Sequence, residues 1–484
     1  MELAKLIEGL PVININGTMN KDITRVVYDS RRAVPGSLFV CIDGFKTDGH
    51  KYALSAADNG ASSFLVEKDI TIFGDATVIK VPDTRYALAR VSAAFFGRPS
   101  DRFNLIGITG TKGKTTTTHM IKSILEQAGQ IVGLIGTVEN SIGSEKIPAQ
   151  RTTPESYDLQ ELFDKMADKG ADSVVMEVSS QGLKLSRVDA SHFKIGVFTN
   201  FSKDHIGANE HTDMEDYLNS KLKLLKMADR GLVNVDSPFS ARILEESKCP
   251  CLTFGIENKS DIMAENINAY ADKVRFNVRT PWFSRTIEVS VPGRFTVYNA
   301  LAAIGVAGIM NINPEHIENG LKNIHVPGRA EVVPTPGKPY TVMIDYAHTP
   351  DSLENILRTV KAFVPNRLIS VFGCGGDRDK GKRPQMGKIS GEIADLTIIT
   401  SDNPRTEDPS AIIKDIEQGI KLTDGQYIII QDRTDAIRYA MSNAQNGDII
   451  LLAGKGHETY QIFRDKTIHY DEREIVKEIL EELE

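Results

Sequence analysis

One segment constrains the fold of this 484-residue chain more than any other. The sequence Gly-Ile-Thr-Gly-Thr-Lys-Gly-Lys-Thr-Thr at residues 107–116 follows an apolar run at 104–108 and precedes a stretch with the apolar spacing of a helix. A strand, a glycine-rich turn and a helix in this order present backbone N–H groups and a helix N-terminus to phosphate oxygens. Lys114 would reach the β- and γ-phosphates, and the Thr115 hydroxyl would hold Mg²⁺. We therefore predict an α/β core that binds ATP or GTP, although Ile108 stands where the strict motif has its first glycine.

Strand-like and helix-like stretches alternate along the rest of the chain. Short apolar runs without alternation are typical of strands covered on both faces of a parallel sheet. The middle of the chain has such runs at 104–108, 173–178, 195–198 and 231–235. A small α/β pattern precedes them, with runs at 25–28, 37–41 and 63–66 and a helix-like stretch at 52–59. A third pattern follows Tyr340, with runs at 342–344, 368–372, 396–399, 427–430 and 449–452. The Pro- and Gly-rich segment 326–339 is expected to be a linker.

Composition narrows the class of protein. Hydrophobic residues make up 41% and charged residues 25% of the chain, which is ordinary for a globular protein. The net charge of −8 argues against a general nucleic-acid binder. Cysteines 41, 249, 251 and 374 form no Cys-x-x-Cys pair, so reduced thiols are expected. Glu2 and Glu8 interrupt any signal-peptide core, and the longest apolar run, 300–310, is shorter than the ~20 residues that span a bilayer. We expect a cytoplasmic protein without membrane insertion.

A lysine lies on the apolar stripe of a predicted helix at residues 214–227. At about 100° per residue, Lys221 falls close to Met214 and Leu225, whereas Lys223 points nearly opposite. Two interpretations remain open: the side chain reaches solvent along its stem, or the amine is neutral and reacts with CO₂. The resulting carbamate would be a carboxylate-like ligand for a hard cation, with Glu177 and His205 as companion ligands.

Several motifs occur in an order and spacing that resemble one family. They are Thr109–Thr116 (Thr-Gly-Thr-Lys-Gly-Lys-Thr-Thr), Glu177-Val-Ser-Ser180, Thr199-Asn200, Asp204-His205, Lys221, Asn299, Gly328-Arg329, Asp345-Tyr-Ala-His348 and Gly454-Lys-Gly-His-Glu458. Together they resemble the Mur ligases, from Asp29-Ser-Arg31 to Glu458. The resemblance implies three α/β domains: an N-terminal domain for UDP-MurNAc (1–102), a central P-loop ATPase domain with a mostly parallel sheet (103–330), and a C-terminal Rossmann-like domain for the amino acid (331–484).

The resemblance also implies a reaction. ATP phosphorylates the D-Glu carboxylate of UDP-MurNAc-L-Ala-D-Glu, and the amine of meso-2,6-diaminopimelate attacks the acyl phosphate to form an amide. This cytoplasmic step of peptidoglycan precursor synthesis requires Mg²⁺ and no protein nucleophile. A monomer that binds no nucleic acid is expected.

The family's functional residues fall on matching positions of this sequence. Catalytic roles fall on Lys114, Lys221, His205 and Glu177. Thr115 and Glu177 would hold a first Mg²⁺, and His205 and the Lys221 carbamate would hold a second metal. ATP-binding positions are Gly110, Thr111, Lys112, Gly113, Lys114, Thr115, Thr116, Asn299, Arg329 and Asp345. Positions for the sugar-peptide are Ser30, Thr152, Thr153, Ser179 and Arg187.

A tetrapeptide indicates which amino acid is added. Asp402-Asn403-Pro404-Arg405 matches the signature of the diaminopimelate-adding members, and Arg405 offers a bidentate fork to the second carboxylate. Arg378 lies at a further matching position, and Gly454 and Glu458 match the pair that receives the distal ammonium group. Lysine-adding relatives usually lack this arginine.

Three departures from the family pattern accompany the resemblance. The segment near the second metal reads Asp204-His-Ile-Gly-Ala-Asn-Glu-His211, where the family usually has Asp-His-Leu-Asp-x-His-Gly, so Glu210 or His211 would replace the side chains that are missing. Lys112 stands where many members have Asn, and Leu185 stands where some have Gln. Alternatives are the same chemistry with L-lysine or another diamino acid, a folylpolyglutamate synthetase-like paralogue, and a P-loop switch. The N-terminal domain and the 402–405 signature argue against the folate type, and Lys221 with the third domain argues against a switch.

Overall fold

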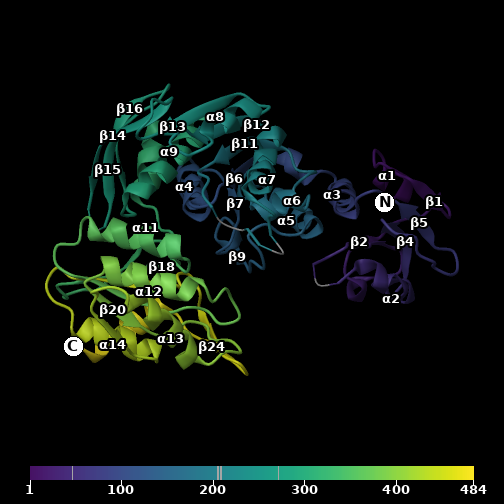
Figure 1. Cartoon of the computed structure of the whole chain (residues 1–484). Helices are drawn as coiled ribbons and strands as arrows, with labels where there is room; N and C mark the ends of the chain where they lie inside the picture. Colours follow the sequence, from purple (N-terminus) through teal and green to yellow (C-terminus); the bar gives the residue numbers. More distant parts are fainter. Residues whose placement is uncertain (46, 204–205, 208–209, 271, 484) are drawn as a thin grey trace. The chain divides into compact units, whose positions relative to one another are not determined.

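The computed structural model describes residues 1–45, 47–203, 206–207, 210–270 and 272–483. Two compact units are present. The first contains Met1–Met263, Arg279–Phe283 and Leu301–Gly320, and the second contains Ala264–Val278, Ser284–Ala300 and Leu321–Glu484. Figure 1 labels the helices and strands along the chain.

The N-terminal sheet has the strand order β1-β5-β4-β3-β2, in which only the β1–β5 pair is antiparallel among the neighbours described. Its elements are α1 (Leu3–Leu6), β1 (Asn14–Asn16), β2 (Arg25–Val27), η1 (Ser30–Arg32), β3 (Ser37–Val40), η2 (Gly49–Tyr52), α2 (Ala53–Asp58), β4 (Ala61–Val66), β5 (Thr77–Lys80), α3 (Thr84–Phe95) and η3 (Pro99–Arg102). Leu38 and Leu65 enter one apolar cluster, whereas Phe39 and Phe64 enter another. Apolar contacts on both faces explain why these strands show no alternation.

The central sheet has the order β16-β15-β14-β13-β12-β11-β6-β10-β7-β8-β9. Its strands are β6 (Asn104–Thr109), β7 (Val132–Ile135), β8 (Asn140–Ile142), β9 (Glu145–Ile147), β10 (Ser173–Glu177), β11 (Phe193–Phe198), β12 (Ala228–Asn234), β13 (Cys251–Gly255), β14 (Ile262–Ala269), β15 (Val274–Arg279) and β16 (Ser284–Val289). The run from β7 to β14 through β10, β6, β11, β12 and β13 is parallel, as predicted.

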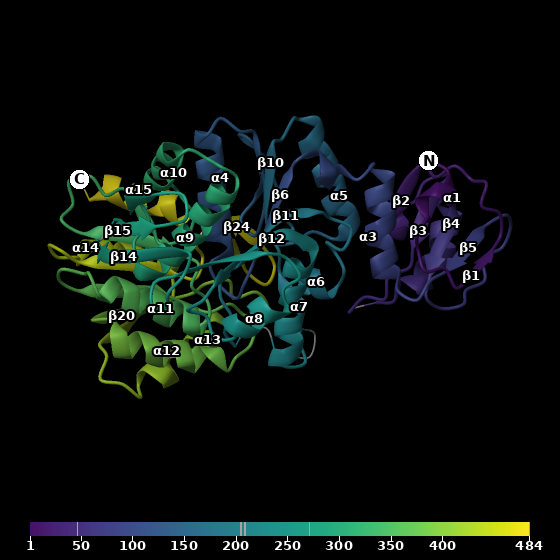
Figure 2. The same cartoon turned by 90° about the horizontal axis from the view of Figure 1, so that it is seen from above.

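Helices pack on both faces of this sheet. They are α4 (Lys114–Gln127), α5 (Ser156–Asp168), α6 (Ser180–Lys184), α7 (Met214–Met227), α8 (Ser240–Glu246), α9 (Arg294–Ile309) and α10 (Pro314–Lys322). Phe163 of α5 and Leu224 of α7 share one apolar cluster with Val174 and Met176 of β10, and α4 lies on the opposite side (Figure 2). Because the strands in the run from β7 to β14 are parallel, their carboxyl ends lie at one edge of the sheet, and the polar loop residues lie there.

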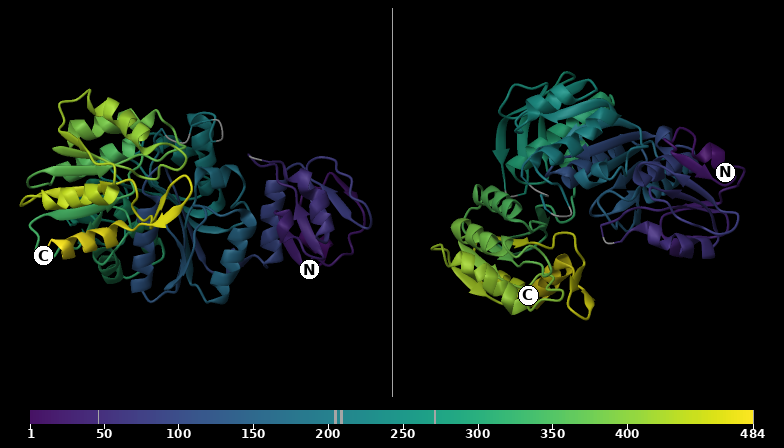
Figure 3. Two further views of the ribbon diagram at one scale, coloured as in Figure 1. Left: turned by 90° about the horizontal axis from the view of Figure 1, so that it is seen from below. Right: turned by 45° about the vertical axis from the view of Figure 1, so that its right-hand side comes forward.

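The C-terminal sheet has the order β17-β18-β22-β19-β20-β21, and helices cover both faces (Figure 3). Its elements are β17 (Glu331–Val333), β18 (Thr341–Asp345), α11 (Pro350–Lys361), β19 (Leu368–Phe372), α12 (Lys382–Ile393), β20 (Leu396–Ile399), α13 (Pro409–Ile420), β21 (Tyr427–Ile429), α14 (Arg433–Ser442), β22 (Ile449–Ala453), the hairpin β23 (Tyr460–Ile462) and β24 (Thr467–His469), and α15 (Glu472–Glu482). In this order, the neighbours from β18 through β22, β19 and β20 to β21 pair in parallel, which confirms the predicted α/β class.

The prediction that residues 326–339 are a linker is wrong in part. Residues Glu331–Val333 form β17, which pairs antiparallel with β18. Pro334 follows this strand directly, and proline is tolerated where an edge strand ends. Pro334 therefore marks the end of a strand within this segment. In the part of the chain that the structure describes, no helix is long and apolar enough to cross a membrane.

Candidate active site

The glycine-rich loop connects β6 to α4 as predicted. Gly113 is the N-cap of α4 and has a φ of +84°, in the left-handed region that favours glycine. Gly110 has a φ of +148°, and a side chain there would collide with Thr199 Oγ1. The Lys114 ammonium donates to Gly110 O at 2.9 Å and to Thr111 O at 3.0 Å. The loop thus places a cation and a helix N-terminus together, the arrangement that suits phosphate oxygens.

The neighbouring strand fixes the shape of this loop. Thr199 and Asn200 follow the end of β11, which is parallel to β6. The Asn200 amide donates to Lys112 O at 2.9 Å and accepts from Lys112 N at 2.9 Å, while Thr199 Oγ1 donates to Lys112 O at 2.7 Å. These bonds hold the backbone at Lys112 from two sides, so the shape of the loop is fixed before a nucleotide binds.

Glu177 is the centre of a polar cluster at the carboxyl end of β10. Thr115 Oγ1 donates to Glu177 Oε1 at 3.0 Å, and Thr137 donates to the same carboxylate through its N–H at 2.9 Å and its hydroxyl at 3.1 Å. Thr137 Oγ1 also lies 3.0 Å from Thr152 Oγ1, and Thr153 Oγ1 donates to Glu177 O at 2.9 Å. Sequence reasoning missed Thr137; its only signal is a polar residue just after a strand.

The residues around Glu177 fit a Mg²⁺ ion. Hard carboxylate and hydroxyl oxygens meet there, and Glu177 is almost fully buried. Mg²⁺ is usually held by one or two carboxylates together with phosphate oxygens and water. Among the described residues no group of three or more His, Cys, Asp or Glu residues could hold a metal.

Lys221 lies on the packing face of α7, as its position on the apolar stripe predicted. Its side chain is buried, with 1% of the residue exposed. The amine donates to Gly110 O at 2.7 Å and lies 4.6 Å from the centre of the Tyr217 ring. The Tyr217 hydroxyl in turn donates to Thr111 Oγ1 at 3.2 Å. Lys221 therefore reaches the phosphate loop rather than solvent, which decides against the solvent-reaching interpretation.

The second-metal segment is described only in part. His205, predicted as a ligand, lies outside the described residues, and so does Asp204. His211 is fully buried, its Nδ1 lies 3.3 Å from Asp216 Oδ2, and its ring packs 4.9 Å from Tyr217. Burial lowers the pKa of His211, so its neutral form is favoured. The Glu210 carbonyl accepts a hydrogen bond from Lys184.

The positions predicted for the sugar-peptide lie on several elements. Ser30 is buried at the start of η1, where its carbonyl accepts from Asn59. Ser179 is the N-cap of α6, and Ser179 N donates to Thr153 Oγ1 at 2.9 Å. The Arg187 guanidinium donates to Thr153 O at 3.1 Å.

A buried carboxylate holds Arg187. Glu155 Oε2 lies 3.3 Å from Arg187 Nε and 3.3 Å from Arg85 Nη1. Burial lowers the pKa of Arg187, and the negative charge of Glu155 opposes this effect. Sequence reasoning missed Glu155, because two of its three arginine partners, Arg85 and Arg187, are distant in the chain.

Three predicted nucleotide positions belong to the second unit. Asn299 is buried on α9. The Arg329 guanidinium lies 5.0 Å from the centre of the Tyr346 ring, and Asp345 Oδ2 accepts from Ala330 N at 2.8 Å. Burial raises the pKa of Asp345, while the charge of Arg329 lowers it.

The structure brings the predicted amino-acid residues together at the carboxyl edge of the C-terminal sheet. Arg405 Nη1 donates to Gly376 O at 2.9 Å. A side chain at Gly375 would lie 2.8 Å from Arg405 Nη1 and 3.8 Å from Arg378 Cγ, so both arginines lie beside this glycine. Either guanidinium group could pair with an anionic group bound there.

The other predicted amino-acid residues form a hydrogen-bonded network. Asn403 Nδ2 donates to Glu458 Oε2 at 2.8 Å, and a Cβ at Gly454 would lie 2.7 Å from Asp402 Oδ2. Lys455, which the sequence did not single out, pairs with Glu458 at 3.2 Å and is fully buried. Pro404 is buried between Asn403 and Arg405. Burial raises the pKa of Glu458, and Lys455 opposes this effect.

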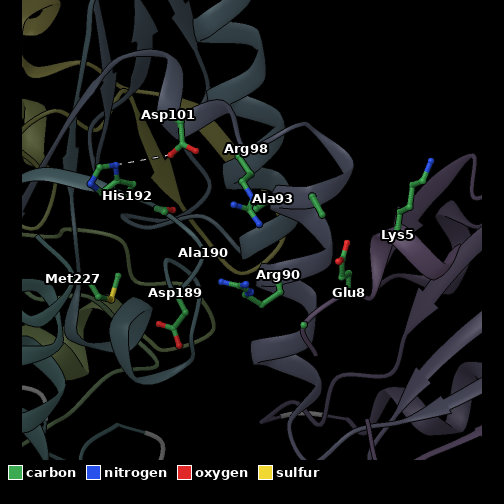
Figure 4. Close-up of a pocket in the computed structure, with 13 residues that line it drawn as sticks. Lys5, Glu8, Arg90, Ala93, Arg98, Asp101, Asp189, Ala190, His192 and Met227 are labelled. Atoms are coloured by element: carbon green, nitrogen blue, oxygen red, sulfur yellow. Dashed lines mark ion pairs between the residues drawn. The ribbon is translucent and has the colours of Figure 1, made fainter. Parts of the chain in front are cut away.

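The first unit also contains a cleft, whose lining residues are drawn in Figure 4. Its volume is about 630 Å³, and its lining includes Ser191 and His192, which precede β11, and Met227, which precedes β12. The phosphate loop follows the carboxyl end of β6, which is parallel to β11. The cleft therefore opens at the amino ends of the strands. Its walls carry charges of both signs, including Arg90 and Asp189, and contain no predicted site residue.

Three protein-family models match the chain. The Mur ligase family, catalytic domain model matches residues 22–96, the Mur ligase middle domain model matches 108–307, and the Mur ligase, glutamate ligase domain model matches 328–456. The chain therefore belongs to the Mur ligase family. Members of this family depend on ATP and use Mg²⁺, and the predicted ligase class and three-domain α/β fold are confirmed.

Individual relatives cover the whole chain. The UDP-N-acetylmuramoyl-L-alanyl-D-glutamate–2,6-diaminopimelate ligase of Caldanaerobacter subterraneus subsp. tengcongensis is 50% identical over 485 residues, with 100% of both chains covered. The ligase of the same name from Clostridium perfringens is 47% identical over 487 residues, with 99% of this chain and 100% of the relative covered. A solved structure of a ligase with this name has 28% identity and a TM-score of 0.74, and covers 100% of this chain and 99% of its own.

Proposed function

We propose that this chain uses ATP to join meso-2,6-diaminopimelate to the D-Glu carboxylate of UDP-N-acetylmuramoyl-L-alanyl-D-glutamate, in peptidoglycan precursor synthesis. The observation that supports the choice of amino acid is that Arg405 and Arg378 both lie beside Gly375. Two arginines beside one glycine suit the second carboxylate of a diaminodicarboxylic acid. Relatives named for this reaction, 50% and 47% identical to this chain, support the same substrate.

The reaction needs positioning and charge neutralisation more than a protein nucleophile. In the first step an oxygen of the D-Glu carboxylate attacks the γ-phosphorus of ATP, and the bond to the β-phosphate oxygen breaks to release ADP. The Lys114 ammonium and the backbone N–H groups at the N-terminus of α4 would stabilise the negative charge of the transferred group. Thr115 and Glu177 would hold Mg²⁺, which neutralises phosphate charge when bound.

In the second step the amine attacks the acyl carbon. Phosphate leaves with its electron pair, and the amine loses a proton, so an amide and inorganic phosphate result. The amino acid would be oriented by Arg405 and Arg378 at its distal carboxylate and by Gly454 and Glu458 at its distal ammonium group. Asp402, Asn403 and Pro404 would line the same site. A paired Glu458 is suited to this role because Lys455 keeps part of the buried charge compensated.

Lys221 is proposed to act as a carbamate. Its neutral amine would attack CO₂, form a C–N bond and release one proton, which leaves a carboxylate-like group for a second metal site shared with His205. Burial of Lys221, with 1% of the residue exposed, supports this proposal, because an ammonium group removed from water is costly unless it is paired or chemically neutralised. Glu210 or His211 would complete that neighbourhood.

The remaining roles complete the proposal. Asn299, Arg329 and Asp345 would contact the adenosine part of ATP, and Thr116 would extend the phosphate loop at the first turn of α4. Ser30 would contact the uridine, and Thr152, Thr153, Ser179 and Arg187 would hold the sugar-peptide. The proposal also includes domain boundaries at 102/103 and 330/331, which limited proteolysis tests. It includes a monomeric state, which light scattering tests, as well as a cytoplasmic location and no binding of nucleic acid.

One assay tests the proposed function. The purified chain is incubated with the nucleotide dipeptide, MgATP and separate amino acids, and the products are weighed. A nucleotide tripeptide containing meso-diaminopimelate is expected, with little product from L-lysine. A preference for L-lysine would replace the proposed amino acid, and ATP hydrolysis without any amide product would refute the ligase assignment.

A further inference from the structure

Cys249 and Cys251 form a thiol pair that the ligase reaction does not use. They flank Pro250, and their sulfur atoms lie 3.9 Å apart. Both residues are half-buried, on the edge of the apolar cluster that contains Leu225 of α7. A disulfide has an S–S distance of about 2.05 Å, so the two sulfur atoms need to close by only about 2 Å to bond.

The backbone around the pair is held in place. Cys251 begins β13 and pairs with Gly231 of β12, and Gly231 N donates to Pro250 O at 2.9 Å. Gly231 also leaves room for the sulfur atoms, because a side chain there would collide with Cys251 Sγ and lie 3.2 Å from Cys249 Sγ. Pro250 fixes its own φ and restricts the residue before it, so little chain entropy is lost when the two thiols meet.

The two thiols have different reactivity. Contact with the Cys249 thiol lowers the pKa of Cys251 to about 6, and the Ser247 hydroxyl, 3.4 Å away, acts in the same direction. The same contact raises the pKa of Cys249. Cys251, whose sulfur also contacts the Ser247 hydroxyl, is therefore the thiol expected to attack first, and Cys249 the one that follows.

The other two cysteines provide an internal comparison. Burial raises the pKa of Cys41 and of Cys374 to about 12. Both are buried in the described structure. They are expected to be inert under conditions in which Cys251 reacts.

We propose that Cys249 and Cys251 are a redox modification site that forms a reversible intramolecular disulfide by exchange with a low-molecular-weight disulfide. In the first step the Cys251 thiolate attacks one sulfur of the reagent, which forms a mixed disulfide and releases one thiolate. In the second step the Cys249 sulfur attacks Cys251 Sγ, and the second reagent thiolate leaves. The proton of Cys249 passes to the released thiolate, so two protein thiols are oxidised and one reagent disulfide is reduced to two thiols.

A short peptide ring gives this disulfide a specific property. Two cysteines separated by one residue close a small ring, and strained disulfides have higher, more oxidising potentials than structural ones. The bond should therefore be removed readily by an excess of the reduced reagent. Cys249 and Cys251 pack against the apolar cluster that contains Leu225, which lies one helical turn from Lys221. The thiol pair therefore lies next to α7, the helix that carries this lysine.

The test uses the full chain and oxidised glutathione. The wild-type protein should lose two hydrogens without gaining glutathione, the peptide containing residues 249–251 should carry the bond, and reduced glutathione should reverse it. Alkylation of Cys249 and Cys251 should fall by at least about tenfold, because disulfide sulfur is not a nucleophile. Cys41 and Cys374 should remain reduced throughout.

Single substitutions identify the order of attack. Each single variant should trap glutathione on its remaining thiol, because no second thiol displaces it. Cys249→Ser should react faster than Cys251→Ser, because the Ser247 hydroxyl still contacts Cys251. A Cys41→Ser, Cys374→Ser double variant should behave like wild type. Accumulation of a glutathione adduct in the wild type, a bond between two chains, or equal reaction of both single variants would overturn the proposal.

Discussion

Thr115 Oγ1 donates a hydrogen bond of 3.0 Å to Oε1 of Glu177, and so joins the first turn of α4 to the carboxyl end of β10. Strand β6, which precedes Thr115, and strand β10, which ends at Glu177, are adjacent and parallel. A hydroxyl and a carboxylate are thus fixed side by side beneath the glycine-rich loop. This pair is the part of the molecule best suited to hold Mg²⁺ against a triphosphate.

Glu177→Gln keeps the size of the side chain and removes its charge. We expect kcat to fall by at least about 100-fold, since a preorganised charge near a phosphoryl group contributes several kcal/mol to the transition state. The Mg²⁺ concentration for half-maximal rate should rise. Glu126→Gln, on the exposed side of α4, is the matched control and should leave both values near wild type. An unchanged Mg²⁺ dependence in Glu177→Gln would remove this carboxylate from the metal site.

Lys221→Ala tests the carbamate. The rate should fall by at least about 100-fold and recover in part with added short carboxylates such as acetate or formate, which supply the lost ligand. Lys223→Ala changes a lysine on the same helix whose amine donates to Leu183 O, and should retain activity. A near-normal rate for Lys221→Ala would exclude the carbamate, and loss of activity without rescue would favour a structural role.

Arg405→Lys tests the choice of amino acid. Replacing a bidentate fork by a point charge should raise the KM for meso-diaminopimelate by about 10- to 100-fold and leave the KM for ATP within about twofold. Arg438→Ala, which removes an arginine that pairs with Glu482, is the control. Equal effects on both KM values would contradict the specificity assignment.

Local sequence patterns predicted the elements well where the signal lay within one segment. Helix α7 begins at Met214 and ends at Met227 as expected, and the loop between β6 and α4 lies where its glycines indicated. Apolar periodicity and glycine positions depend only on nearby residues, so they can be read from one stretch of chain.

Other features depend on residues that are distant in the chain. Strand β17 lies within a Pro-rich stretch because β18 supplies its partner. The role of Thr137 depends on Glu177, 40 residues away, and that of Glu155 on Arg85, 70 residues away. No local pattern identifies such partners, so these residues could be found only in the folded chain.

A buried ion pair supports the proposed amino-acid site. Arg433 and Glu472 are fully buried and lie 2.8 Å apart. Arg433 also donates to Ala453 O at 2.9 Å and to Ser401 O at 3.3 Å, the residues that precede Gly454 and Asp402. The pair therefore anchors both segments that carry the predicted site residues.

Glu472→Gln should destabilise the C-terminal part of the chain. Removing one partner of a buried pair leaves an uncompensated charge and costs about 3–5 kcal/mol in the free energy of unfolding. Urea denaturation followed by far-UV circular dichroism measures it. Glu482→Gln, which removes an exposed partner of Arg438, should change little. A similarly small effect of Glu472→Gln would show that the pair is not needed to hold these segments.

The central claim is that ATP activates a carboxylate which an amine then attacks. The most direct measurement uses a nucleotide dipeptide whose D-Glu carboxylate carries heavy oxygen, together with MgATP and meso-diaminopimelate. If the acyl phosphate forms, one heavy oxygen passes from the carboxylate to the inorganic phosphate for each amide made. Unlabelled phosphate accompanying the amide would contradict the account, because the carboxylate oxygen would then never have been bonded to phosphorus.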